Sequence, residues 1–156
     1  MNQVQPKLEK IQFKIGLSGT YWGKKPQYEI LVNDHKCHEG IIKLEPNQTE
    51  FFEFTVDLEE DQDHKLQIRL VNKTDKDVVK DVDDKDNFKI VNDMLLNIDS
   101  IWIDDIDLCG LMWSESRFVG DDPSRPVLKN CVNLGWNGTY ILDFSSPFYI
   151  WLLEKM

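Results

Sequence analysis

Hydrophobic and polar residues alternate through most of this 156-residue chain, which is the pattern of half-buried β-strands. Two long alternating runs lie near the middle, at residues 64–72 and 98–108. Further runs cover residues 11–17, 28–34, 37–44, 51–57, 127–134, 140–144 and 148–153. No window keeps an apolar stripe at helical spacing for more than two turns. The pattern therefore predicts about nine short strands in an all-β fold, a β-sandwich of the jelly-roll kind.

Three details refine this prediction. The run at 98–108 changes phase at Asp104-Asp105, and a β-bulge is the expected cause. Asn137-Gly138 is the strongest hairpin signal in the chain. Phe148–Leu153 is apolar on both parities, which predicts a strand buried on both faces or a strand at an interface.

Length, charge and termini restrict the classes of protein. A chain of 156 residues fits one sandwich domain over 1–156, with residues 1–10 as an N-terminal arm. The net charge of −10 disfavours nucleic acid and anionic membranes as partners.

The chain shows no secretion signal at its start and no apolar run of about 20 residues, so we expect a product made in the cytoplasm with no membrane insertion. The three cysteines predict reduced thiols.

An acidic segment lies between the two central runs. Its aspartates are Asp75, Asp77, Asp81, Asp83, Asp84, Asp86 and Asp93. Carboxylates are the ligands that calcium prefers, although the interleaved lysines equally suit a solvated loop. The spacing is not that of an EF-hand. Residues held by strands suit a selective site better than the middle of the loop, so the predicted calcium ligands are Asn72, Asp93, Asp104 and Asp105.

Aromatic residues in predicted loops are the other candidates for binding. They are Tyr21, Trp22, Trp113 and Trp136. An indole or phenol ring can stack on a sugar ring or anchor a protein interface, and it can equally cap the core. The sequence has no nucleophile elbow, phosphate loop or zinc-protease motif, so we expect no enzymatic activity.

Four segments resemble the calcium-dependent xylan-binding carbohydrate-binding modules. They are Tyr28–Asp34, Phe52–Asp57, His64–Asn72 and Leu95–Asp105. The resemblance implies a β-sandwich in which a strand ending in asparagine leads into a loop that holds calcium, and the calcium coordinates sugar hydroxyls. It points to Asn72 and Asp93 as ligands. The chain departs from that pattern in its Asp/Lys-rich insertion at 75–89 and in the residues after Leu108.

Two other segments, Leu17–Tyr28 and Cys131–Glu154, resemble small proteins encoded by marine tailed phages, including those of cyanobacteria. This resemblance implies a place on the virion. The combined hypothesis is a non-catalytic, virion-associated sandwich that binds glycans, with calcium as the candidate cofactor. The alternative is a phage structural or decoration protein that makes only protein–protein contacts, as an oligomer or with other virion proteins.

Overall fold

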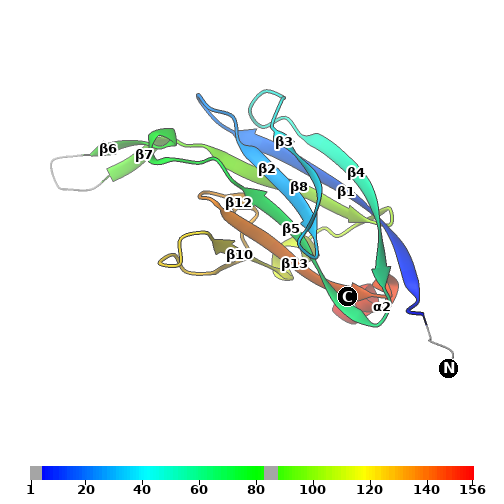
Figure 1. The fold of residues 1–156 in the computed structure, drawn as a ribbon. Coiled ribbons are helices and arrows are strands. Elements are labelled where there is room, and N and C mark those ends of the chain that lie inside the picture. Colours follow the sequence, from blue (N-terminus) through cyan, green and yellow to red (C-terminus); the bar gives the residue numbers. More distant parts are fainter. Residues whose placement is uncertain (1–4, 83–87) are drawn as a thin grey trace.

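The computed structural model describes residues 5–82 and 88–156 and arranges them as two packed antiparallel sheets (Figure 1). Sheet A has the strand order β12-β8-β1-β4, and β9 pairs with β8. Its strands are β1 (Leu8–Thr20), β4 (Glu50–Glu59), β8 (Leu95–Ile103), β9 (Ile106–Asp107) and β12 (Asn133–Leu134). Because β1 begins at Leu8, it includes the end of the segment predicted as an arm.

Sheet B has the strand order β11-β10-β13-β5-β2-β3. Its strands are β2 (Gln27–Val32), β3 (His35–Ile41), β5 (Gln62–Leu70), β10 (Ser116–Gly120), β11 (Leu128–Lys129) and β13 (Gly138–Ser146). The predicted β-sandwich is confirmed. In the described part of the chain, no helix is long and apolar enough to cross a membrane.

The acidic segment forms the 3-10 turn η1 (Asp75–Asp77) and the hairpin of β6 (Val79–Val82) and β7 (Phe88–Asn92). This hairpin extends away from the sandwich (Figure 1). Asp83, Asp84 and Asp86, which belong to the predicted acidic loop, lie outside the described residues.

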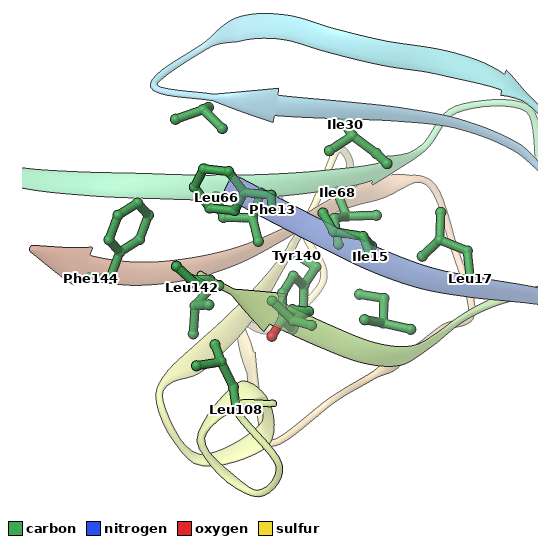
Figure 2. Close-up of a cluster of buried hydrophobic side chains, with 14 of the residues drawn as sticks. Phe13, Ile15, Leu17, Ile30, Leu66, Ile68, Leu108, Tyr140, Leu142 and Phe144 are labelled. Atoms are coloured by element: carbon green, nitrogen blue, oxygen red, sulfur yellow. The ribbon is translucent and has the colours of Figure 1, made fainter. Parts of the chain in front are cut away.

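The core lies between the inner faces of the two sheets (Figure 2). Alternation along each strand sends every second side chain inward, so the predicted core face of β5 is buried as expected. Fully buried core residues include Phe13, Ile15 and Leu17 of β1, Ile30 of β2, Leu66, Ile68 and Leu70 of β5, and Tyr140 and Leu142 of β13. Burial of each such side chain stabilises the fold by about 1.5–3 kcal/mol.

The predicted strand at 148–153 is wrong, because this segment forms the helix α2 (Phe148–Lys155). Phe148, Trp151 and Leu152 have helical spacing and are buried. The backbone N–H of Phe148 donates to the Glu9 carboxylate at 3.0 Å, which satisfies a donor of the first helical turn. This partner comes from β1, far away in sequence, so the local pattern could not reveal it. A second short helix, α1 (Leu111–Ser114), follows β9.

The predicted bulge at Asp104-Asp105 is also wrong. These residues form a two-residue turn that joins β8 to β9, with φ angles of 49° and 63°. Positive φ at both positions is the geometry of the tight turns that suit strand twist.

The bulge of β8 lies instead at Asp99. Gly16 of β1 pairs with Ser100, whereas the next residue, Leu17, pairs with Ile98, so Asp99 is the extra residue. A bulge re-aims the side chain at the extra position. It also explains why the buried residues of β8 change parity between Ile98 and Ile101.

Asn137-Gly138 does not make a hairpin. The strand before it, β12, belongs to sheet A, and the strand after it, β13, belongs to sheet B. The predicted strand at 127–134 is likewise divided between sheets, as β11 and β12. The chain therefore crosses from one sheet to the other at Gly135–Asn137.

Candidate functional site

A cleft of about 690 Å³ opens at the end of the sandwich where β5 and β10 end and β8 and β13 begin. Its volume is within the range of pockets that hold small ligands. The lining combines carboxylates, cationic groups, an amide and an indole: Lys73, Thr74, Asp75, Val78, Lys80, Asp93, Asp121, Asp122, Arg125, Gly135, Trp136 and Asn137.

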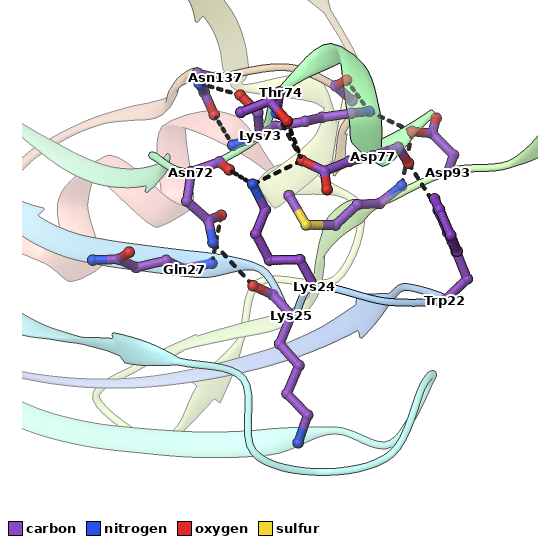
Figure 3. Close-up of polar contacts among 12 residues, drawn as sticks. Trp22, Lys24, Lys25, Gln27, Asn72, Lys73, Thr74, Asp77, Asp93 and Asn137 are labelled. Atoms are coloured by element: carbon purple, nitrogen blue, oxygen red, sulfur yellow. Dashed lines mark hydrogen bonds and ion pairs between the residues drawn. The ribbon is translucent and has the colours of Figure 1, made fainter. Parts of the chain in front are cut away.

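An ion pair between Lys73 and Asp93 forms part of this lining (Figure 3). The Nζ of Lys73 lies 2.5 Å from Asp93 Oδ1, and it also donates to the carbonyl oxygen of Gly135 at 2.5 Å. Only 8% of the Lys73 side chain and 21% of the Asp93 side chain are exposed. The backbone N–H of Met94 donates to the same carboxylate oxygen. Asp93, a predicted calcium ligand, therefore already has a cation beside it.

Two asparagine side chains fix the backbone around this ion pair (Figure 3). Asn137 accepts from the backbone N–H of Lys73 at 2.8 Å and donates to its carbonyl at 2.9 Å. Asn72, another predicted calcium ligand, accepts from the backbone N–H of Gln27 at 2.9 Å and donates to the carbonyl of Lys25 at 3.0 Å. Each amide continues a strand-like hydrogen-bond pattern, so both serve to hold the loop after β5 in place.

Trp136, predicted to contact a ligand, forms a wall of the cleft. The Arg125 guanidinium lies over its ring, 4.1 Å from the centroid, and Phe118 packs against it with the ring centroids 5.6 Å apart. Gly120 leaves room for the indole, because a Cβ at Gly120 would lie 2.7 Å from Nε1. The stacked guanidinium presents its N–H donors along the cleft wall.

Carboxylates form the rim. Asp121 lies 3.6 Å from the Arg69 guanidinium. Asp122 accepts hydrogen bonds from the backbone N–H of Ser124 at 2.9 Å and from its hydroxyl at 2.8 Å. These hydrogen bonds, the backbone one first, lower the pKa of Asp122. Asp122 therefore presents a charged acceptor to the cleft at neutral pH.

Trp22, another predicted ligand contact, lies beside η1 (Figure 3). Its indole N–H donates to the carbonyl of Asp77 at 2.9 Å, and half of the residue stays exposed. The Asp77 carboxylate contacts Lys24 at 2.9 Å. Burial raises the pKa of Asp77, but hydrogen bonds from Lys24 and Thr74 outweigh that effect and lower it. The first turn of the acidic segment is thus bound to the β1–β2 loop.

The other predicted site residues lie elsewhere. Asp93 precedes β8, whereas Asp104 and Asp105 follow it. A strand of nine residues is about 30 Å long, so these aspartates are far apart. Asp104 Oδ1 accepts from the backbone N–H of Gln12. Trp113 follows β9 at that same end and lines an apolar hollow with α2. The four predicted calcium ligands therefore do not form one cluster, and of the predicted aromatic contacts only Trp136 lines the cleft.

Tyr21, the remaining predicted contact, packs against the core and donates its hydroxyl to the carbonyl of Leu44 at 2.8 Å. Sequence reasoning missed Lys73, Asp121, Asp122 and Arg125. The Asp122–Ser124 spacing is typical of a side-chain-stabilised turn, and it was the one local signal that this irregular segment is ordered.

No protein-family model and no curated protein matches the chain. Among solved structures, the chain is similar to a carbohydrate-binding module described as "vCBM60 in complex with galactobiose". The two share 9% sequence identity at a TM-score of 0.51, over 84% of this chain and 96% of the other. At this identity the likeness establishes a shared β-sandwich fold. It agrees with the fold that the resemblance to carbohydrate-binding modules implied.

Proposed function

We propose that this protein is a non-catalytic module that binds neutral oligosaccharides in the cleft at the end of the sandwich. The observation that carries the proposal is the Arg125–Trp136 stack, which lines the cleft together with Asp93, Asp121 and Asp122. Sugar hydroxyls need fixed donors and acceptors beside an apolar surface, and this wall offers both. The fold shared with a module whose structure holds galactobiose supports the same function.

Charge selects the class of sugar. The chain has a net charge of −10, and four carboxylates line the cleft against three cationic side chains. An acidic glycan would meet like charges, which disfavour binding. Neutral hydroxyls instead donate to ionised carboxylates, and such charge-assisted hydrogen bonds are stronger than neutral ones.

Binding is favoured over hydrolysis by the state of the carboxylates. A glycosidase needs one protonated carboxylic acid to donate to the leaving group and a second carboxylate opposite it. Asp93 instead forms an ion pair with Lys73, and hydrogen bonds from Ser124 lower the pKa of Asp122. Carboxylates that already accept from a cation or from hydroxyl and amide donors suit recognition of sugar hydroxyls rather than general acid catalysis.

Calcium, expected from the resemblance, does not fit the residues predicted to bind it. Asp93 and Asp104 lie at opposite ends of β8, and the amide of Asn72 is taken up by backbone groups. Lys73 instead places an ammonium between the Asp93 carboxylate and the Gly135 carbonyl, oxygens of the kind that bind calcium. We therefore expect sugar binding to persist in EDTA. Loss of sugar binding in EDTA would contradict this expectation. A melting temperature that rises with calcium would contradict the misfit of calcium, because a ligand of the native state stabilises it.

A glycan array, probed with and without EDTA and followed by calorimetry on the best sugar, tests the proposed function. Arg125→Ala should weaken binding at least tenfold, equivalent to about 1.4 kcal/mol, because it removes the stacked guanidinium from the cleft. Arg117→Ala is the matched control, since Arg117 pairs with Asp143 on sheet B away from the cleft. No sugar binding in either condition would refute the proposal.

A second candidate function, contact with other proteins of a virion, rests on α2. The helix buries one face but exposes Tyr149, Ile150 and Leu153 on the other, and Leu153 is 71% exposed. Apolar surface of this kind favours a protein interface. With the resemblance to phage proteins, it supports a place on the particle. Mass spectrometry of purified phage particles from a host that carries the gene is the test, and absence of the protein from them would exclude this function.

A further inference from the structure

The outer face of sheet A carries a second hollow, a groove of about 430 Å³. Its polar lining consists of hydroxyl and amide side chains with one carboxylate: Ser18, Thr20, Asn47, Thr49, Asn97, Asn133 and Asp99. No lysine or arginine lines the groove among the described residues. Such a surface differs from the cleft, where both signs of charge meet.

Strand register builds the groove across three strands. Asn133 of β12 pairs with Asn97 of β8, and Asn97 pairs with Ser18 of β1. Their side chains therefore form one row across the sheet, with a spacing of about 4.8 Å between neighbours. The Asn97 amide donates to the hydroxyl of Thr20 at 3.0 Å, which fixes its orientation. Asn97 is only 8% exposed, so it forms the floor of the groove.

The bulge aims Asp99 at the same groove. As the extra residue of β8, Asp99 is exposed and its Oδ2 accepts from the Thr49 hydroxyl at 2.8 Å. Among the described residues, Asp99 Oδ1 and Asn97 Oδ1 accept no hydrogen bond, and the Asn133 side-chain amide neither donates nor accepts one. Donors and acceptors that point outward from a rigid strand frame are the groups that recognise sugar hydroxyls.

An aromatic surface adjoins the groove on the same outer face. Phe51 of β4 pairs with Gly16, the residue two positions before Ser18, and is 55% exposed. Trp102 of β8 lies nearby, because the Lys14 ammonium sits 5.0 Å from the Phe51 ring centroid and 5.5 Å from that of Trp102. Two aromatic rings that share the Lys14 ammonium, beside hydroxyl, amide and carboxylate groups, provide the apolar and hydrogen-bonding contacts that a sugar chain needs.

From this arrangement we infer that the outer face of sheet A is a second binding site for a neutral oligosaccharide, separate from the cleft. The class of ligand rests on the proposed function, whereas the location rests on the groove alone. Two sites on one domain let a single chain hold two points of a polysaccharide, which raises avidity when both are engaged.

Chemical-shift mapping of the full chain, titrated with xylohexaose and separately with galactobiose, tests this inference. Amide signals from residues 18–20, 47–49 and 97–99 should shift and saturate. Thr49→Val removes the hydroxyl that holds Asp99, so it should weaken the groove response at least tenfold and leave the cleft signals unchanged. Thr55→Val is the matched control, because Thr55 is exposed on the same face of β4 as Phe51 and does not line the groove.

The outcomes separate the two sites. The second site is overturned if the groove signals do not shift with either sugar. It is also overturned if Thr49→Val and Thr55→Val weaken the groove response to the same extent. Groove signals that respond while Arg125→Ala has no effect support the second site and remove the cleft from the proposed function. If neither region responds to either sugar, both proposals fall.

Discussion

Replacement of Lys73 by methionine tests the ion pair in the cleft. The change keeps the apolar stem but removes the ammonium that lies 2.5 Å from Asp93 Oδ1. Loss of one partner from a fully buried ion pair costs about 3–5 kcal/mol, because the other charge is left without compensation. Asp93 is 21% exposed, so water screens part of the loss. We therefore expect Lys73→Met to lower the free energy of unfolding by about 2–3 kcal/mol.

Urea unfolding, followed by tryptophan fluorescence, measures this loss, and thermal unfolding should show a fall of about 5–10 °C at this chain length. The double variant with Asp93→Asn isolates the pair, with an expected coupling energy of about 1–2 kcal/mol. Lys76→Met is the control, because Lys76 is exposed and should change stability by less than about 0.5 kcal/mol. A coupling energy below about 0.5 kcal/mol would refute the stabilising role of the Lys73–Asp93 ion pair.

Three further predictions concern folding. Asp105→Gly should raise the free energy of unfolding by about 0.5–1 kcal/mol in urea unfolding, because φ is 63° there and glycine adopts that conformation without strain; a loss of stability would contradict the turn. The pKa of Asp77 is lowered in the folded protein, so ionised Asp77 stabilises the fold above about pH 4, and this stabilisation is lost as the pH falls further. In urea unfolding at graded pH, Asp77→Asn should therefore reduce the fall in the free energy of unfolding below about pH 4. An unchanged dependence of that free energy on pH would exclude the effect. Phe148→Ala should cost about 3–5 kcal/mol by the same assay, and a loss under about 1 kcal/mol would mean that α2 is not packed on the core.

The cleft depends on parts of the chain that no local pattern connects. Sequence patterns placed Asp93 among the candidates because it stands just before a strand, and Trp136 because it is an aromatic residue in a predicted loop. They did not identify Lys73 or Arg125, because a lysine in an acidic loop and an arginine among prolines look solvated. Their partners, Asp93 and Trp136, are fixed by the way the two sheets pack.

The sequence by itself determined the clearly alternating strands, such as β1, β2, β4 and β5, and the faces that they bury. Alternation with a period of two is a local property, and it sends Leu66, Ile68 and Leu70 inward whatever the strand order. Tertiary structure alone decided the rest. The helix α2 depends on the carboxylate of Glu9, and the bulge at Asp99 depends on the register with β1. Both are contacts between distant segments, whose partners are chosen by packing of the whole chain rather than by neighbouring residues.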